Sequence, residues 1–108
     1  MTKIFYALFA FLFITNSALA EDRRIRIHNQ THKRIVELYG SPIDESRYTY
    51  NMIQGPGQWI RAGETRIADI DDGTGYCRYD LKVVLANGDF AEKLNVNVCE
   101  MTDWYIHD

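Results

Sequence analysis

Cysteine and proline are scarce in this sequence of 108 residues, which contains two of each. The two cysteines, Cys77 and Cys99, do not form a CxxC pair, which excludes the common redox and zinc motifs built on such pairs. Beyond residue 20, no apolar run approaches the roughly 20 residues needed to cross a bilayer. Basic residues are fewer than acidic ones, 12 against 15, which argues against a nucleic-acid binder.

Sequence signatures of catalysis are missing as well. There is no Gly-x-Ser-x-Gly elbow and no phosphate-binding loop, and the carboxylates are too scattered to assign an acid and a base. The histidines His28, His32 and His107 do not have zinc-site spacing in the strand and turn context where they occur. We therefore predict no catalytic residue, no cofactor and no enzymatic activity; a hydrolase using dispersed carboxylates is the least favoured alternative.

The first 20 residues have the organisation of a cleaved signal peptide. Lys3 provides a positive start, an apolar run of about eleven residues extends from Ile4 to Ile14, and Ala18-Leu19-Ala20 matches the small-x-small cleavage rule. A membrane anchor would need a run of about 20 residues. We expect cleavage after Ala20, a single domain from residue 21 to 108, no membrane attachment after cleavage, and a periplasmic or secreted location.

The rest of the chain is rich in short segments with the period-two alternation of β-strands. In the first of them, Ile25 and Ile27 alternate with polar residues, as in a strand with one solvated face. The second has apolar residues on both parities, which predicts a more central strand. The expected strands are 23–29, 34–39, 65–70, the hairpin 76–99 and a last strand or strap within 100–108. They predict an all-β fold, a small antiparallel β-sandwich, for which immunoglobulin-like topology is the usual solution at this size.

Asn87-Gly88 is a strong signal for a two-residue hairpin turn. Such a turn makes the apolar faces of the two strands coincide, which supports the register. The facing pairs would be Leu85 with Phe90, Leu81 with Leu94, Tyr79 with Val96, and Cys77 with Val98.

Cys77 and Cys99 are expected to form a disulfide, because an exported small domain with two cysteines allows one intrachain pairing. The bond would contribute roughly 3 kcal/mol in the chain-entropy model. The two-residue turn leaves Cys99 one position out of register with Cys77. We therefore expect a β-bulge or the end of the strand close to Cys99; the alternative is a bond between two sheets.

Two short motifs invite a functional interpretation. Asp69, Asp71 and Asp72 precede Gly73, but they do not match the spacing of a calcium-binding loop, and Asp-Asp-Gly is more often a simple turn. A small-ligand or calcium site in the loop Asp69–Gly75 is therefore kept as the second hypothesis. Asn29-Gln30-Thr31 matches the acceptor pattern for N-glycosylation, a pattern that often occurs by chance.

Aromatic residues are the main surplus of the chain. Five of them lie in the irregular region or near strand ends: Tyr48, Tyr50, Trp59, Trp104 and Tyr105. Exposed together, they would form a platform for an unknown protein or glycan partner. The alternative is that the tryptophans fill the core, which we consider the better interpretation for Trp59. The leading hypothesis is thus a non-enzymatic exported domain that binds a macromolecular partner.

Several motifs, taken in order, resemble a group of small exported bacterial proteins of unknown function. In this chain they are Asn29–Thr31, Ser41-Pro42, Cys77-x-Tyr79-Asp80-Leu81 and Asn97-Val98-Cys99. Members often have tryptophan at the position of Tyr48. The resemblance implies a bacterial origin and a periplasmic location. The resemblance implies no activity. Similar sequences are sometimes named argininosuccinate lyase, but that enzyme is a large helical oligomer, unlike this chain.

Overall fold

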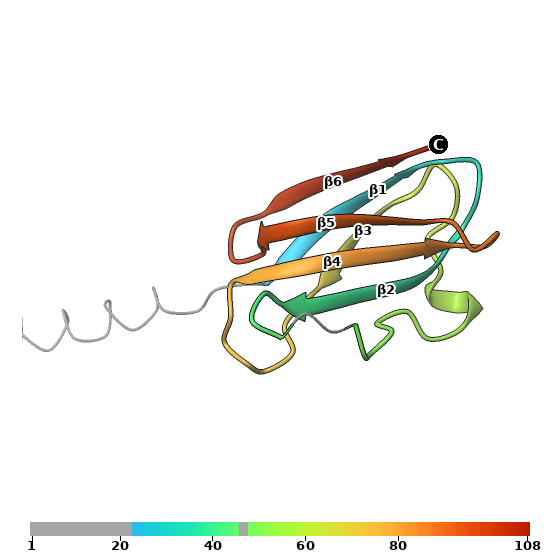
Figure 1. Cartoon of the computed structure of the whole chain (residues 1–108). Coiled ribbons are helices and arrows are strands. Elements are labelled where there is room, and N and C mark those ends of the chain that lie inside the picture. Colours follow the sequence, from blue (N-terminus) through green and yellow to red (C-terminus); the bar gives the residue numbers. More distant parts are fainter. Residues whose placement is uncertain (1–22, 46–47) are drawn as a thin grey trace, which may run out of the picture.

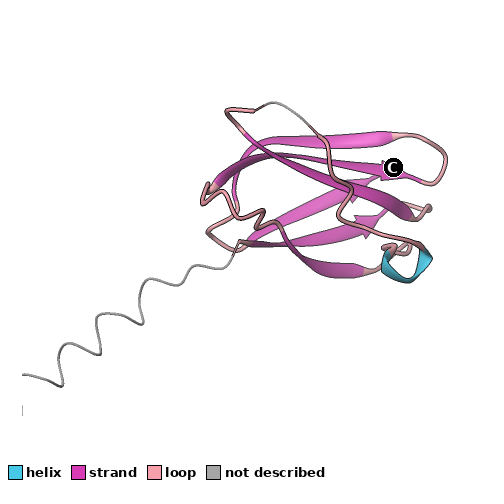
Figure 2. Ribbon diagram, turned by 90° about the horizontal axis from the view of Figure 1, so that it is seen from below, coloured by secondary structure: helices cyan, strands magenta, loops and turns pink. Residues whose placement is uncertain are grey.

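A computed structural model describes residues 23–45 and 48–108, which form two three-stranded sheets packed face to face (Figures 1 and 2). The expected signal peptide and its cleavage after Ala20 lie outside the described residues. The elements are β1 (Arg24–Gln30), β2 (Ile35–Pro42), the 3-10 helix η3 (Pro56–Gln58), β3 (Thr65–Asp69), β4 (Arg78–Leu85), β5 (Phe90–Asn97) and β6 (Thr102–His107). Within the described ranges, no helix is long and apolar enough to cross a membrane.

One sheet has the order β3-β1-β6 and the other β2-β4-β5. All neighbours are antiparallel except β1 and β6, which run parallel. The all-β sandwich predicted from the alternating segments is therefore confirmed. Its core consists of the inward side chains of both sheets, among which Ile25, Ile27, Tyr79, Leu81 and Val83 are completely buried.

The prediction that the second strand is the more central one is wrong. β1 is the middle strand of its sheet, whereas β2 lies at the edge of the other. The pairing of β2 with β4 is irregular between Ile35 and Glu37, and this extra residue brings both Ile35 and Leu38 into the core. The apolar residues on two parities thus reflect a bulge and not two buried faces.

The outer edge of β2 is covered by the segment that follows it. The N–H of Met52 donates to the Leu38 carbonyl at 2.7 Å, and Ile60 exchanges backbone hydrogen bonds with Ile35 at 2.8 and 3.0 Å. The Asn51 side chain accepts hydrogen bonds from the N–H groups of Leu38 and Ile53. The segment 51–60 therefore protects a strand edge.

The hairpin of β4 and β5 has a three-residue turn instead of the predicted two-residue turn. The N–H of Leu85 donates to the Asp89 carbonyl at 2.7 Å, and Gly88 has a φ of 93°. This geometry is typical of a type I turn followed by a left-handed residue. Phe90 consequently pairs with Val84 and points to solvent, instead of facing Leu85.

A β-bulge later in β5 restores the predicted register. Leu81 pairs with Lys93 and not with Leu94, whereas Tyr79 pairs with Val96 as expected. The extra residue lies at Leu94 and Asn95, and Asn95 has a φ of 55°. The bulge exists, but it is several residues from Cys99; it compensates for the longer turn.

The disulfide Cys77–Cys99 is present and joins the open ends of β4 and β5. The N–H of Val98 donates to the Cys77 carbonyl at 2.8 Å, so Cys77 faces Val98 as predicted. β5 ends at Asn97, whose side chain accepts a hydrogen bond from the Cys99 N–H at 3.1 Å. The strand end therefore absorbs the one-residue offset, and the bond lies within one sheet.

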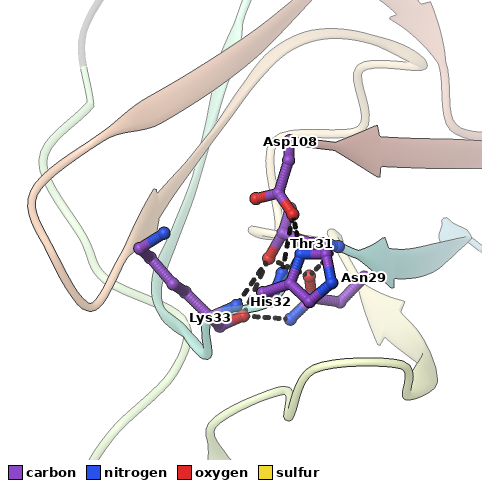
Figure 3. Close-up of polar contacts among 5 residues, drawn as sticks. All are labelled: Asn29, Thr31, His32, Lys33 and Asp108. Atoms are coloured by element: carbon purple, nitrogen blue, oxygen red, sulfur yellow. Dashed lines mark hydrogen bonds and ion pairs between the residues drawn. The ribbon is translucent and has the colours of Figure 1, made fainter.

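The turn after β1 is built around the side chain of Asn29, which is 1% exposed (Figure 3). Its Nδ2 donates to the carbonyls of Lys33 at 2.8 Å and Ile60 at 3.0 Å. Its Oδ1 accepts from the N–H and the hydroxyl of Thr31. The acceptor pattern Asn29-Gln30-Thr31 is thus a buried turn motif, because a glycan could not reach this amide nitrogen.

The same turn holds the end of β6. The carboxylate of Asp108 accepts a hydrogen bond from the His32 N–H at 3.0 Å and pairs with the His32 imidazole (Figure 3). The hydrogen bond from the imidazole lowers the pKa of Asp108. This contact connects the residue that follows β6 to the loop between β1 and β2.

Candidate functional site

The most organised polar group on the surface lies on the outer face of the β3-β1-β6 sheet. We call it the His28 network, and it consists of Arg26, His28, Thr65, Asp103 and Tyr105. His28 Nδ1 lies 2.9 Å from the Thr65 hydroxyl, and His28 Nε2 lies 2.8 Å from Asp103 Oδ1. Arg26 Nε donates to the same Asp103 oxygen at 2.8 Å.

Strand register brings these residues together from three segments of the chain. On β1, Arg26 and His28 alternate with Ile25 and Ile27, which point into the core, so the two polar side chains share the outer face. His28 pairs with Thr65 of β3 on one side and with Tyr105 of β6 on the other. The network is therefore a product of sheet pairing.

The partners of His28 fix its tautomer. The Asp103 carboxylate is an acceptor only, so His28 Nε2 donates the hydrogen bond. In the neutral ring, Nδ1 then accepts from the Thr65 hydroxyl. The hydrogen bonds from His28 and Arg26 together lower the pKa of Asp103 and keep its carboxylate ionised.

A hydroxyl, an imidazole and a carboxylate in series also occur in acyl-transfer enzymes. Here they lie on an open sheet face, where Thr65 is exposed. The cavities of about 350 and 540 Å³ are lined by other residues. The Asp103 carboxylate also forms an ion pair with Arg26. Acyl transfer needs, in addition, preorganised donors for the oxyanion and a site from which water is excluded. The arrangement therefore favours a positioning role for His28.

The group that His28 positions is Tyr105. The two rings are stacked, with centroids 4.2 Å apart and an interplanar angle of 9°. Tyr105 is nevertheless 51% exposed, and across β1 on β3, Ile67 is 54% exposed. The face thus combines a fixed aromatic ring, an exposed aliphatic side chain and the guanidinium groups of Arg24 and Arg26.

The five aromatic residues expected to form a platform do not lie together. Tyr105 is on the outer face of β6, Tyr50 is exposed beside the aspartate loop, and Trp59 is half-buried under the guanidinium of Arg34. Trp104 is only 6% exposed and belongs to the core, because it alternates with Tyr105 along β6. The expectation of a partner contact is therefore corrected for Trp104; core filling, proposed mainly for Trp59, applies to it.

Tyr48 belongs to a different group, on the outer face of the β2-β4-β5 sheet. Its ring lies 6.2 Å from that of Tyr39, and the ammonium of Lys82 lies between the rings of Tyr48 and Phe90, at 5.8 and 4.7 Å. The Tyr48 hydroxyl donates to Glu92 at 3.1 Å. Burial and this hydrogen bond raise the pKa of Tyr48 to about 12.

This pKa predicts a stability change in alkali. A raised pKa means that the fold favours the neutral phenol, so the stabilisation is complete below the ordinary value of 10.0 and is lost as the pH rises towards about 12. We expect the free energy of unfolding to fall less steeply over this range in Tyr48→Phe than in the wild type, when measured by chemical denaturation. The exposed Tyr50→Phe is the control and should follow the wild type. Equal slopes for all three proteins would contradict the assignment.

The aspartate loop uses its carboxylates internally. Asp69, Asp71 and Asp72 each accept a hydrogen bond from a backbone N–H two residues later. Asp72 also accepts from the Thr74 and Tyr79 hydroxyls; burial raises its pKa, but these hydrogen bonds outweigh burial and lower it. These are the turn contacts anticipated for Asp-Asp-Gly. Among the described residues, no group of three potential metal ligands occurs.

No local sequence pattern indicates the His28 network directly. Alternation puts Thr65 and Ile67 on one side of their strand, but only the pairing with β1 shows that this side is the outer one. Arg26 lies on the polar side of its segment, and nothing in the sequence around it indicates a contact with Asp103. The sequence feature that does bear on the network is the alternation in 23–29 and in the last strand. In the last strand it puts Trp104 and Ile106 on one face and Asp103 and Tyr105 on the other.

Comparison with known proteins identifies a shared fold and no family. No family model matches the chain, and no curated protein matches it. The NMR structure of a protein from Eubacterium rectale superposes with a TM-score of 0.52 at 17% identity, covering 81% of this chain and 78% of that one. At this identity the similarity establishes the architecture alone, and the function has to be argued from the surface of this molecule.

Proposed function

We propose that this protein is an exported, periplasmic or secreted domain without enzymatic activity that binds a macromolecular partner, a protein or a glycan, through the outer face of the β3-β1-β6 sheet. Export is supported by the leader-like sequence and by the disulfide, since disulfides persist mainly outside the cytoplasm. That the protein has no enzymatic activity is likewise a proposal.

The observation that carries the proposal is the fixed orientation of Tyr105. An exposed tyrosine normally loses rotamer freedom when it enters an interface, at about 0.5–1.5 kcal/mol per side chain. Here the stack on His28, which is itself bonded to Thr65 and Asp103, restricts the ring beforehand. Preorganised aromatic side chains are typical of the residues that dominate binding energy.

The neighbours of Tyr105 give the face the composition of an interface. Ile67 adds an exposed apolar contact, and Arg24 and Arg26 add donors for carboxylate, phosphate or sugar oxygens. Asp69 and Asp103 lie on the same face, so it carries both signs of charge. Such a face suits a partner with a mixed polar and apolar surface.

The test uses the mature protein carrying a photoreactive amino acid at position 24, added to the envelope and secreted fractions of the cells that produce it. Cross-linked proteins are identified by mass spectrometry, and glycans are tested separately on an array. We expect Tyr105→Ser and Ile67→Ser to reduce capture or glycan binding at least tenfold, the loss typical of a residue that contributes about 1.4 kcal/mol.

Phe90→Ser is the matched control. Phe90 is 60% exposed, but on the outer face of the other sheet. It should retain binding, and circular dichroism should show that all three variants are folded. Equal loss with Phe90→Ser, or full binding by Tyr105→Ser and Ile67→Ser, would refute the proposed face.

A further inference from the structure

The four strand edges of the sandwich differ in how they are protected against pairing with another strand. The edge of β2 is covered by the segment 51–60. β5 has a bulge at Leu94 and Asn95, and its Lys93 lies opposite the buried Leu81, on the inner side of the sheet. Bulges and inward-pointing charges are common devices that prevent edge-to-edge association.

β3 is protected in a similar way. It is only five residues long, and its inward side chain Arg66 donates to the carbonyls of Gln58 and Trp59, at 2.7 and 3.1 Å. β6 has none of these devices. It contains no proline and no bulge, and its inward side chains are Trp104 and Ile106. Among the described strands, β6 therefore has the open edge.

Register shows which backbone groups face this edge. The N–H of Asn29 on β1 donates to the Glu64 carbonyl, and the Asn29 carbonyl accepts from the Gly63 N–H, both on the side of β3. The backbone N–H and C=O groups of odd-numbered residues of β1 therefore point towards β3, and those of even-numbered residues point towards β6. In a parallel pair, Arg26 and His28 then bond to the residues that flank Asp103 and Tyr105. The N–H and C=O groups of Asp103, Tyr105 and His107 consequently point away from β1.

These three residues form a self-complementary set. An antiparallel pair of identical strands with Tyr105 opposite Tyr105 places Asp103 of each copy opposite His107 of the other. An imidazole and a carboxylate facing each other across strands can form a hydrogen bond, and such cross-strand polar pairs favour pairing. On the inner side, the same register sets Trp104 opposite Ile106. Every backbone group brought into the new ladder is one that faces the free edge.

A cavity with a mixed lining, apolar on one part and polar at Asp89, His107 and Asp108, opens along the same side of the sandwich. Its volume is about 540 Å³, and its lining includes Leu85, Phe90, Ala91 and Ile106. A second copy paired at β6 would place its own strand edge, with Trp104 and Ile106, over this opening. Apolar surface would then be buried in addition to the backbone hydrogen bonds that form. The edge and the cavity therefore favour the same occupant.

We propose that β6 pairs antiparallel with the β6 of a second copy, with Tyr105 on the two-fold axis, to form a dimer with one continuous six-stranded sheet. The two outer faces then form a single surface, and the interface is isologous, as in most homodimers. This inference goes beyond the proposed function, because partner binding by the outer face does not require a dimer.

The first test is the molar mass of the mature protein, measured by light scattering and sedimentation over a wide concentration range. We expect a concentration-dependent dimer. Tyr105→Pro removes an N–H that makes no bond to β1, so it should weaken the dimer at least tenfold while the monomer stays folded. Ile67→Pro removes the corresponding N–H on the β3 edge and should leave the dimer unchanged.

The second test addresses register and does not depend on proline. In the proposed pair, the Cα atoms of the two residues at position 105 are about 5.5 Å apart, within the range that a disulfide spans. Tyr105→Cys should oxidise to a covalent dimer, whereas Ile67→Cys, which is similarly exposed, should not. His107→Asp should weaken the wild-type dimer because it faces Asp103, and His107→Lys should retain it.

A monomer at all concentrations would overturn the proposal. So would a dimer that Ile67→Pro weakens as much as Tyr105→Pro, or equal cross-linking by both cysteine variants. If the dimer is absent, partner capture by the outer face can still occur. If partner capture is absent, the dimer can still form. Ile67→Ser separates the two proposals, because it changes the outer face and leaves the β6 edge intact.

Discussion

Replacing Asn29 with aspartate is expected to lower the free energy of unfolding by roughly 3 kcal/mol, although the side chain hardly changes in size. The amide nitrogen of Asn29 donates both its hydrogens, to the carbonyls of Lys33 and Ile60. A carboxylate has no donor, so the carbonyls of Lys33 and Ile60 would each lose one hydrogen bond and would face a negative charge. Thermal and urea denaturation would measure the loss.

Asn51→Asp is a matched control for this substitution. The side-chain oxygen of Asn51 accepts from the N–H groups of Leu38 and Ile53, and a carboxylate can accept both bonds. We therefore expect a change of less than about 1 kcal/mol. Similar losses for Asn29→Asp and Asn51→Asp would show that charge itself, and not the missing donor, destabilises the fold.

Removing the disulfide is the second change with a large expected effect. The double variant Cys77→Ala with Cys99→Ala should lose about 3 kcal/mol, because the bond joins cysteines 22 positions apart and restricts the unfolded chain. The denaturant m-value should rise at the same time, since an unfolded chain without the cross-link exposes more surface. Urea unfolding measures both quantities.

Reduced wild-type protein provides the control. It lacks the bond but keeps both sulfur atoms, so it should match the double variant in stability and m-value. If both forms are as stable as the oxidised protein, then the β4-β5 hairpin is already closed in the unfolded state, and the entropic account is wrong.

The sequence was sufficient for the strands and for the disulfide because both depend on local information. Alternation in 23–29 and 65–70 marks β-strands, and two cysteines leave only one intrachain pairing. Register near the turn was not accessible. Asn87 bonds to the N–H and the carboxylate of Asp89, which favours the longer turn, and pattern matching on Asn-Gly does not reveal this contact.

The candidate site depends on pairings that no single segment contains. His28 meets Thr65 and Asp103 only because β1 lies between β3 and β6, and that strand order cannot be derived from periodicity. The misplacement of Trp104 has a different cause. Position near a strand end groups Trp104 with Tyr105, whereas alternation along β6 sends the two rings to opposite sides of the sheet.

The parallel pairing of β1 with β6 also governs the order in which the domain can be completed. β4 and β5 are neighbours along the chain, but β1 must wait for the last strand, Thr102–His107, before its sheet has a third member. Until residues 102–107 are available, the chain therefore leaves Ile25 and Ile27 without Trp104 and Ile106, which belong to the same core. Completion of the β3-β1-β6 sheet thus depends on pairing between distant parts of the chain, which forms more slowly than local pairing and leaves apolar surface exposed in the meantime.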